Sequence, residues 1–377
     1  MPKLRLFTPG PTMVPDEVLL EMARPIEHHR TQTYRDWLKE CTENLQYLFQ
    51  TRGSCLTISG SGSAAAEGAI VCTVPPGRKA LVCHGGKFGE RWRDVCRRYG
   101  IDHIEYEYEY GRGADPQRVA DILAKEPAVS VVITVHSETS TCALTDVAAM
   151  ARITRQRDCL LMTDCITSVG CLPFKMDEWG IDVAVTGSQK ALMLPPGLSF
   201  VAVNERAWKV IESFEAPLFY NNLRAYKKSL ADWDAPWTPA NTLVRALRVS
   251  LAMIRKEGLE NVWARTARLA RATRDAAVAM GLTIFARDPA DSVTGINTPA
   301  GIDNDKWRKG MKARFGVQLA DGQGQLKGKM VRISHMGWVD DLDTLGAIAA
   351  MELTLREQGY KVDPGTGPAA YLKAIAS

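Results

Sequence analysis

Three groups of small or polar residues follow apolar, strand-like segments, and each suits a different chemistry. The turn SGSGSAAAE at 59–67 leaves a short apolar run and opens an alanine-rich helix, so its backbone N–H groups can bind an anion. Asp164 ends the apolar run CLLMTD, where a carboxylate faces the ligand crevice of a parallel sheet and needs a cationic or N–H partner. Lys190 follows VAVTGSQ among small and apolar neighbours, which favours a nucleophilic amine of lowered pKa.

The glycine-rich turn is compatible with more than one ligand. It fits the pattern G-x-G-x-x-A of dinucleotide-binding folds through Gly60, Gly62 and Ala65, but no acidic residue stands about 20 residues later, where CHGGK is found at 83–87. It is not a nucleotide-binding loop of the Walker A type, because no Gly-Lys-Ser/Thr follows. A phosphate-bearing small cofactor fits it better, and a purely structural tight turn stays open.

The acid and the lysine also have structural alternatives when each is taken alone. Asp164 or Ser168 can cap a turn, and Lys190 can be an ordinary surface lysine. The combination is more specific than its parts, because an anion-binding turn, an acid ending one strand and a lysine after the next are what pyridoxal phosphate requires. The turn would anchor its phosphate, Asp164 would pair with its pyridine nitrogen, and Lys190 would form the Schiff base with its aldehyde.

At this point the chain resembles a known family, the class V, fold type I pyridoxal-phosphate aminotransferases, and within it the alanine–glyoxylate and serine–pyruvate transaminases. The motifs that carry the resemblance occur in the family's order along nearly the whole chain. They are LFTPGPTMVP (6–15), EHHRTQTYRDW (27–37), SGSGSAAAEG (59–68), GGKFGERW (85–92), HSETSTC (136–142), TDCITSVG (163–170), GSQKALMLPPGLSF (187–200), WTPAN (237–241) and VRISHMG (331–337).

The resemblance implies a role for each of a set of residues around the cofactor. The phosphate would be held by Ser61, Gly62 and Ser63, with Gln189 close to it beside Lys190; the ring would be contacted by Phe88, Thr139, Asp164 and Ile166. It also implies a homodimer, in which Thr238 reaches the phosphate of the neighbouring subunit. On the substrate side, Arg332 would clamp the α-carboxylate, and the turn containing Gly10 and Pro11 would form part of the wall.

Two positions depart from the family's pattern. Cys142 stands where HSETSTG usually has glycine, so the turn there is expected to differ slightly. Ala235 stands three residues before Thr238, where some members have a tyrosine that contacts the phosphate, so we expect that contact to be absent. Structural alternatives also remain for two of the implied residues: Phe88 can be ordinary core, and Arg332 can pair with an internal carboxylate.

The elements that must position these residues alternate along the chain. Seven strands are expected, at 55–59, 80–84, 103–110, 130–136, 159–164, 183–186 and 198–203, with helices at 63–74, 89–100, 116–126 and 146–158. Strands that are apolar throughout and separated by helices indicate an α/β fold with a mostly parallel sheet covered on both faces, which agrees with the seven-stranded sheet of fold type I.

The chain is expected to divide into three parts. Residues 1–20 would form an N-terminal arm with the substrate-wall turn, residues 21–256 the large cofactor-binding domain, and residues 257–377 a small C-terminal α+β domain. The aromatic, Pro- and Asn-rich segment at 217–241 shows no clear periodicity and is interpreted as a connecting or active-site segment. Gly258 is expected to break a long helical pattern. In the last part LTIF, a turn around GIN, DKWRKGMKARFG and MVRISHMG are the main features.

Composition excludes several other classes of protein. The 377 residues are 46% hydrophobic and 24% charged, with a net charge of only +4, and basic residues are scattered, so no nucleic-acid partner is expected. The basic spots Arg91-Trp92-Arg93 and Tyr226-Lys227-Lys228 are interpreted as solvated surface. No apolar stretch reaches the roughly 18 residues of a membrane span, and residues 1–15 lack a signal-peptide pattern, so a cytoplasmic protein is expected.

Cysteine and histidine usage predicts neither disulfides nor a metal site. The nine cysteines include no C-x-x-C pair, and several lie in apolar runs, so we expect buried free thiols. His28, His29, His136 and His335 lack metal-ligand spacing and are expected to have structural roles.

The sequence therefore predicts a transaminase that uses pyridoxal 5′-phosphate to move the amino group of alanine or serine to glyoxylate or pyruvate. The main alternative is an aspartate-type transaminase, in which Arg30 or a basic residue of 221–228 would bind a second carboxylate. A lyase or cysteine desulfurase on the same fold would need a mobile loop cysteine. A non-enzymatic role, such as a hydrogenase-associated subunit, would leave the Lys–Asp–Arg set without a function.

Overall fold

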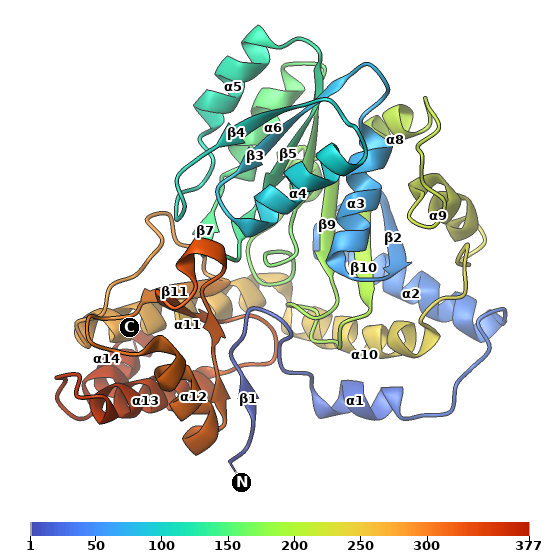
Figure 1. Ribbon diagram of the computed structural model, residues 1–377. Coiled ribbons are helices and arrows are strands. Elements are labelled where there is room, and N and C mark those ends of the chain that lie inside the picture. The colour runs from blue at the N-terminus through green and yellow to red at the C-terminus, as the bar shows by residue number, and fades with distance from the viewer. Residues whose placement is uncertain (1, 377) are drawn as a thin grey trace.

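The computed structural model describes residues 2–376, and its centre is a seven-stranded sheet (Figure 1). The strand order is β2-β10-β9-β8-β5-β3-β4. Their bounds are Ser54–Ser59 (β2), Lys79–His84 (β3), His103–Glu107 (β4), Val129–Val135 (β5), Leu160–Asp164 (β8), Val183–Gly187 (β9) and Leu198–Val203 (β10). Strands β9, β8, β5, β3 and β4 run parallel to one another, and β10 is antiparallel to both β9 and β2. The predicted mostly parallel α/β sheet is confirmed.

Helices cover both faces of this sheet, as its continuously apolar strands require. One face packs against α3 (Gly62–Thr73), α4 (Lys87–Arg98) and α8 (Glu205–Ile211). The other packs against α2 (Gln32–Phe49), α5 (Pro116–Lys125), α6 (Val147–Arg155) and α10 (Asn241–Glu257). Strand β5 shows the division, since Val131 and Ile133 belong to the first core and Val132 to the second.

A third core lies in the C-terminal part. Its antiparallel sheet has the order β11-β14-β13, with bounds Val293–Asn297 (β11), Ala320–Asp321 (β13) and Met330–Ser334 (β14). The surrounding helices are α11 (Leu259–Ala279), α12 (Asn304–Phe315), α13 (Asp341–Glu357) and α14 (Thr366–Ile375). Strand β1 (Arg5–Leu6) pairs with β12 (Val317–Gln318), so the N-terminal arm joins this part. The domain boundaries at residues 20 and 256 stay a prediction.

The remaining elements are short and connect these layers. They are α1 (Asp16–Met22), β6 (Ser137–Glu138), β7 (Ala143–Leu144), α7 (Met176–Trp179), α9 (Leu223–Leu230) and the 3-10 turn η1 (Gly324–Leu326). Gly258, with φ of +84°, separates α10 from α11 as predicted.

Three details of the sequence prediction are wrong. The segment at 217–241 contains helix α9, which Asn222 caps and which buries Leu223 and Tyr226; eight residues are too few to show a clear helical period. The supposed turn around GIN belongs to strand β11, because pairing with β14 extends it. The strand predicted at 103–110 ends at Glu107.

The expectation of buried free cysteines is confirmed. All nine cysteines are buried and have free thiols. Among residues 2–376, no helix combines the length and apolar character needed to cross a lipid bilayer.

Candidate active site

Asp164 and Lys190 meet at the carboxyl edge of the sheet, as their positions after neighbouring strands require. Asp164 is the last residue of β8, and Lys190 lies three residues after β9, which pairs with β8. Both side chains are buried, with 3% and 8% of their surface exposed, and each shifts the pKa of the other by its charge. The structure thus brings together two groups that are 26 positions apart in the chain.

The carboxylate of Asp164 is fixed by two donors. Oδ1 accepts a 2.8 Å hydrogen bond from the backbone N–H of Ile166, and Oδ2 accepts one of 3.0 Å from the indole Nε1 of Trp92. Burial raises the pKa of Asp164 to about 7, and the charge of Glu138 acts in the same direction. Each oxygen keeps a free lone pair, so the carboxylate can accept one more hydrogen bond from a ring N–H.

Lys190 is held against the N-terminal arm. Its Nζ donates a 2.5 Å hydrogen bond to the carbonyl of Pro9, and its own carbonyl accepts one of 2.8 Å from the Thr12 hydroxyl. Gly10 has a φ of +142°, and a Cβ there would stand 2.4 Å from Nζ, so the arm comes this close only with glycine. Pro11 is exposed beside it.

The glycine-rich turn forms an anion cradle near this pair. Ser61 precedes the first residue of α3, and its exposed hydroxyl makes no capping bond. A Cβ on Gly62 would stand 2.6 Å from Cδ1 of Ile166, so the turn lies directly on the residue that follows Asp164 by two. The amide oxygen of Gln189 is buried without a hydrogen-bond partner. A Cβ on Gly187 would stand 3.2 Å from this oxygen and 3.6 Å from the backbone N of Gly62, so Gln189 lies beside the start of α3.

The tripeptide Arg91-Trp92-Arg93, interpreted from the sequence as solvated surface, is so only in part, because Arg91 is exposed but Trp92 is buried. Arg91 donates a 3.0 Å hydrogen bond to the hydroxyl of Ser63, and its guanidinium lies 4.9 Å from the ring centre of half-buried Phe88. Trp92 is fully buried and binds Asp164. Arg91 and Trp92 are consecutive residues of α4, so the helical period places them on different faces of the helix. Reading the three residues as one basic group missed this difference.

Arg332 lies on β14 of the C-terminal part, and its charge contributes to the lowered pKa of Lys190. Its Nε donates to the carbonyl of Asp321 at 2.8 Å and its Nη1 to the carbonyl of Thr139 at 2.9 Å. It is 5% exposed, and within residues 2–376 no carboxylate oxygen lies within 4.0 Å of its guanidinium. The structure therefore does not bear out the alternative of an internal ion pair.

The loop after β6 supplies a further group at the site. The hydroxyl of Thr139 is 2.9 Å from that of Thr167, which the sequence analysis did not single out, and both are buried. Cys142 closes the loop with a φ of 60°, the left-handed conformation that glycine favours, so the cysteine adopts it at some cost in strain.

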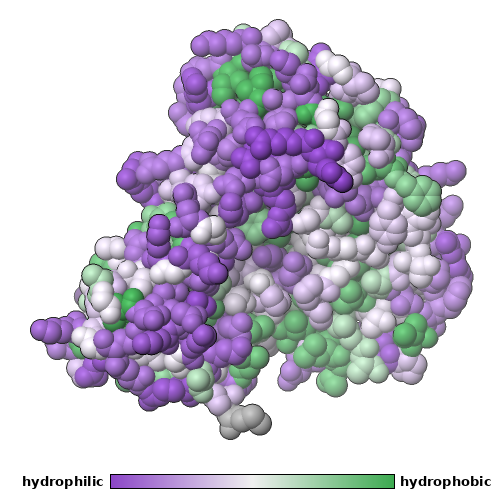
Figure 2. Space-filling model, viewed as in Figure 1, coloured by the Kyte–Doolittle hydropathy of each residue, from purple (hydrophilic) through white to green (hydrophobic). Residues whose placement is uncertain are grey.

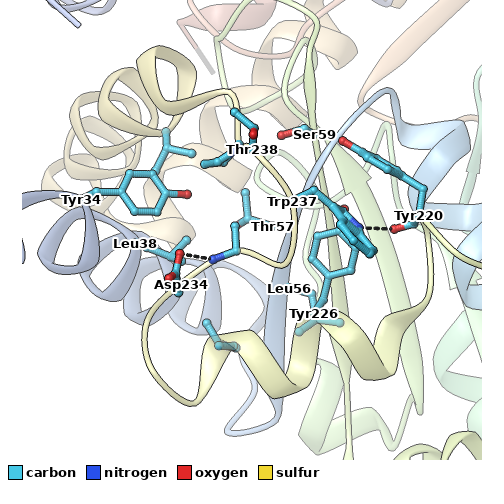
Figure 3. A pocket seen from close by; sticks show the side chains of 14 residues that line it. Tyr34, Leu38, Leu56, Thr57, Ser59, Tyr220, Tyr226, Asp234, Trp237 and Thr238 are labelled. Carbon is cyan, nitrogen blue, oxygen red and sulfur yellow. Dashed lines mark hydrogen bonds between the residues drawn. The ribbon is translucent and has the colours of Figure 1, made fainter. Parts of the chain in front are cut away.

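Thr238 is the one predicted site residue that the structure leaves apart from this set. It is exposed and lines a small pocket with Ser59, Tyr34 and Asp234 (Figure 3). No hydrogen bond within the described chain joins its side chain to the cradle. Its position agrees with a role outside its own subunit, which one chain does not test.

Comparison with known proteins identifies the family to which the chain belongs, the class V aminotransferases. Residues 5–336 match the family described as Aminotransferase class-V. The chain is 38% identical over 381 residues to the soluble hydrogenase 42 kDa subunit of Anabaena cylindrica, covering 100% of this chain and 99% of that protein. It is 37% identical over 378 residues to the serine–glyoxylate aminotransferase of Methylorubrum extorquens, covering 97% and 94%.

Solved structures support the same assignment. The ureidoglycine–glyoxylate aminotransferase of Bacillus subtilis is 30% identical and superposes with a TM-score of 0.94 over 100% of this chain and 99% of that one. The resemblance, the fold type and the cofactor, pyridoxal phosphate, are thereby confirmed. The residues fit this cofactor: the first turn of α3, where glycine lets Gly62 lie against Ile166, suits a phosphate, and a buried acid and a buried lysine that act on each other's pKa suit a ring nitrogen and an aldehyde.

A pH dependence follows from the burial of Lys190. The pKa of Lys190 is lowered from 10.5 to about 8; burial is the largest cause, the charge of Asp164 opposes it, and the charges of Arg332 and Arg91 act in the same direction as burial. The amine therefore becomes neutral as the pH rises through about 8. We expect covalent uptake of the cofactor by cofactor-free protein to speed up about tenfold per pH unit below about 8 and to level off above it.

Borohydride trapping of the bound cofactor at short times, from about pH 6 to about pH 10, measures this rate. Nα-acetyl-lysine amide with the same aldehyde is the control, because its only amine is an unshifted side-chain amine, which keeps gaining reactivity up to about pH 10.4. A protein rate that still rises with the control's slope between about pH 9 and about pH 10 would show that Lys190 is not perturbed.

Proposed function

We propose that this aminotransferase moves the α-amino group of a small neutral amino acid, alanine or serine, to glyoxylate or pyruvate. The observation that carries the proposal is Arg332: a buried guanidinium with no carboxylate partner among the described residues, whose charge acts on Lys190. One such cation suits one carboxylate, the α-carboxylate that every amino acid has. A relative named serine–glyoxylate aminotransferase supports the same choice.

The proposed roles follow from the geometry. Pyridoxal phosphate, when bound, supplies an electron sink for negative charge at the substrate's Cα. Lys190 would hold the aldehyde end and, once displaced by the substrate amine, carry the proton from Cα to the neighbouring carbon of the cofactor. Asp164 would accept a hydrogen bond from the ring N–H and keep that nitrogen protonated, with Trp92 and the N–H of Ile166 fixing its oxygens.

The other residues would bind and orient. Ser61, Gly62 and Ser63 would surround the phosphate at the positive end of α3, with Gln189 beside them. Arg91, which already binds the Ser63 hydroxyl, would add a positive charge there. On the ring, the resemblance places Phe88 and Ile166 on opposite faces and Thr139 at the edge, and Gly10 and Pro11 would line the substrate side next to Lys190.

Pairing within the chain supports a neutral rather than an acidic donor. Arg30 makes a 2.6 Å ion pair with Asp234, so it is already neutralised. In the segment 221–228, Arg224 pairs with Glu215 at 2.6 Å and Lys227 with Glu212 at 2.7 Å. Lys228, the third basic residue of this segment, is exposed and makes no ion pair within the described chain, so it stays open to an aspartate-type enzyme, and one relative is named L-aspartate–glyoxylate aminotransferase.

A comparison of kcat/KM across donors tests this proposal. We expect alanine and serine to exceed aspartate and glutamate with glyoxylate or pyruvate as acceptor, because a second carboxylate would enter the site without a cation and lose its hydration. Each donor is also measured with 2-oxoglutarate as a third acceptor, which tests whether the donor preference depends on the acceptor; the buffer contains no glycine. If aspartate or glutamate is preferred tenfold, about 1.4 kcal/mol of transition-state free energy, the neutral-donor proposal fails and the aspartate-type alternative replaces it.

Two alternative functions find little support in the site. A desulfurase needs a reactive cysteine on a mobile loop, but all nine cysteines are buried, and burial raises the pKa of Cys142, the one in the site loop, to about 12. A hydrogenase-associated role, which the names of two relatives suggest, would leave the buried Lys190, Asp164 and Arg332 without a function.

The homodimer and the cytoplasmic location belong to the same proposal. Large apolar side chains are exposed around α1 and the segment before α9, and Figure 2 shows an apolar surface where Figure 1 places α1. They are Leu19, Leu20, Ile26, Phe219 and Tyr220, exposed by 44% to 77%. The ring of Trp237, next to Thr238, contacts Phe219 and Tyr220. A second copy on this surface would bring Thr238 toward a neighbouring site.

A further inference from the structure

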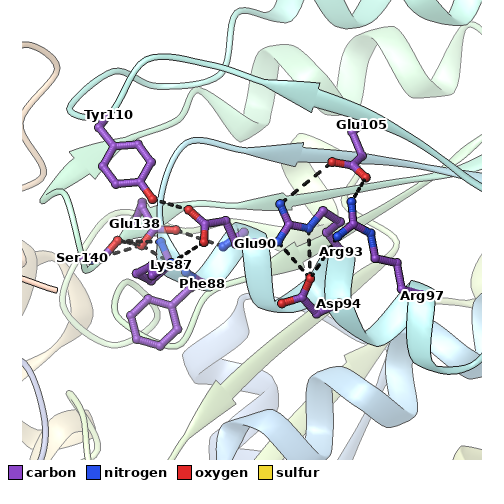
Figure 4. A network of polar contacts seen from close by, with 11 residues as sticks. Lys87, Phe88, Glu90, Arg93, Asp94, Arg97, Glu105, Tyr110, Glu138 and Ser140 are labelled. Carbon is purple, nitrogen blue, oxygen red and sulfur yellow. Dashed lines mark hydrogen bonds and ion pairs between the residues drawn. The ribbon is translucent and has the colours of Figure 1, made fainter. Parts of the chain in front are cut away.

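Glu138 is a buried carboxylate for which the proposed roles leave no use. It ends β6, is 2% exposed, and receives four hydrogen bonds. The donors are the backbone N–H groups of Phe88 (3.4 Å), Gly89 (3.1 Å) and Ser140 (3.1 Å) and the hydroxyl of Ser140 (2.5 Å); Figure 4 shows Phe88 and Ser140 beside Glu138. Four donors on two oxygens suit an ionised carboxylate, although burial raises its pKa.

Glu138 and Ser140 together satisfy the first turn of α4. The residue before this helix, Gly86, has no side chain to cap it, and the free N–H groups of its first three residues are bound from another segment. Ser140 Oγ accepts from Lys87 N at 2.9 Å, and the two oxygens of Glu138 accept from Phe88 and Gly89. A Cβ on Gly86 would stand 2.4 Å from Cδ of Glu138, so glycine is needed for this approach.

The same residues also control the substrate side. Thr139, between Glu138 and Ser140, gives its carbonyl to Nη1 of Arg332, which comes from the C-terminal part of the chain. The carboxylate therefore ties the start of α4, where Phe88 lies, to the loop that orients Arg332. In addition its charge acts on Asp164 and Arg332, so it belongs electrostatically to the site.

We propose that Glu138 is a positioning residue that sets the place of Phe88 over the cofactor ring and of Arg332 on the substrate carboxylate. This rests on the proposed function, because it assigns the ring to Phe88 and the carboxylate to Arg332. Glu138 itself touches neither group. Its effect is to fix both through the N-terminus of α4 and through the backbone of Thr139.

The chain offers a matched control for this role. Glu352 on α13 is 3% exposed and caps α14, whose preceding residue is also a glycine, Gly365. Its Oε1 accepts from Gly365 N at 2.6 Å and its Oε2 from Gly367 N at 2.7 Å. Both bonds lie in the C-terminal part, among residues to which no cofactor or substrate role is assigned. Glu352→Gln thus reproduces the loss of a buried helix-capping charge without touching the site.

The experiment compares Glu138→Gln with Glu352→Gln. In Glu138→Gln one amide N–H would face the N–H of Gly89 or that of Phe88, which repels the start of α4. We expect weaker binding of pyridoxal phosphate to the cofactor-free protein, about tenfold by quenching of tryptophan fluorescence, and a KM for the amino donor raised about tenfold with a smaller change in kcat. Glu352→Gln should lower the melting temperature comparably and leave both constants unchanged.

Two outcomes would overturn the inference. One is an unchanged cofactor affinity and KM in Glu138→Gln; the other is an equal change of these constants in both variants, which would show a merely structural role. If Glu138→Gln does not fold, Ser140→Ala serves instead, because it removes one donor and one acceptor of the cluster and keeps the charge. It must shift cofactor affinity and KM in the same direction. Since cofactor affinity is measured without substrate, failure of the neutral-donor proposal leaves this result interpretable.

Discussion

Lys190→Ala is expected to lose transamination by about 10³-fold or more and to lose the borohydride-reducible bond to the cofactor. The amine is the only buried lysine nitrogen at the carboxyl edge of the sheet within the described chain, and it both holds the aldehyde and carries the proton in the proposed mechanism. The visible absorption of the bound cofactor should shift toward that of free pyridoxal phosphate. The fold should persist, because the side chain removed carries a costly buried amine.

The matched control is Lys175→Ala, which removes a lysine that is 40% exposed and pairs with Glu178 on the surface. It should keep full activity and full trapping. Circular dichroism of both variants checks that the fold is retained. Reducible cofactor in Lys190→Ala, at the stoichiometry of the unmodified protein, would place the covalent bond on another lysine and refute the assignment.

Asp164→Asn is expected to retain the cofactor and to lower kcat by about 10²- to 10⁴-fold. The amide keeps the shape of the side chain but no longer carries the charge that would hold a proton on the ring nitrogen, so the electron sink is weakened. Asp164→Ala should behave similarly and should bind the cofactor less tightly. Steady-state kinetics together with cofactor content measures both effects.

Asp182→Asn is the control for burial of a carboxylate in the same sheet. Asp182 is fully buried just before β9, at the opposite end of the strand from Lys190, and pairs with Arg206 at 3.1 Å. Its loss should reduce stability by about 3 kcal/mol through the unpaired charge, with kcat unchanged. An equal loss of kcat in both variants would mean that Asp164 acts only through the stability of the sheet.

The sequence was sufficient for the architecture and for the residues that end strands. Seven apolar runs separated by helical patterns predict the parallel sheet, and a parallel sheet places Asp164 and Lys190 at one edge whatever the loops do. These inferences depend on local periodicity and on a rule of topology. For that reason they needed no knowledge of distant contacts.

The residues that were missed depend on contacts between distant segments. Trp92 reaches Asp164 across 72 positions, and Glu138 caps a helix about 50 positions earlier in the chain. Nothing in a basic tripeptide or in the motif HSETSTC marks these bonds, because each is created by the packing of α4 on the sheet. Helix α9 was missed for a different reason, since its eight residues are held by Asn222 and by two buried side chains rather than by a long amphipathic pattern.

A half-reaction followed by absorbance tests the central claim most directly, since a transaminase must pass the amino group to its cofactor before any acceptor is present. Protein loaded with pyridoxal phosphate is mixed with alanine alone, and then glyoxylate is added. We expect alanine to convert the bound cofactor to its amine form with one pyruvate released per site, and glyoxylate to restore the original spectrum; Lys190→Ala should do neither at a comparable rate. Sulfide release from cysteine, or no change of the cofactor with any amino acid donor, would contradict the assignment as a transaminase acting through Lys190.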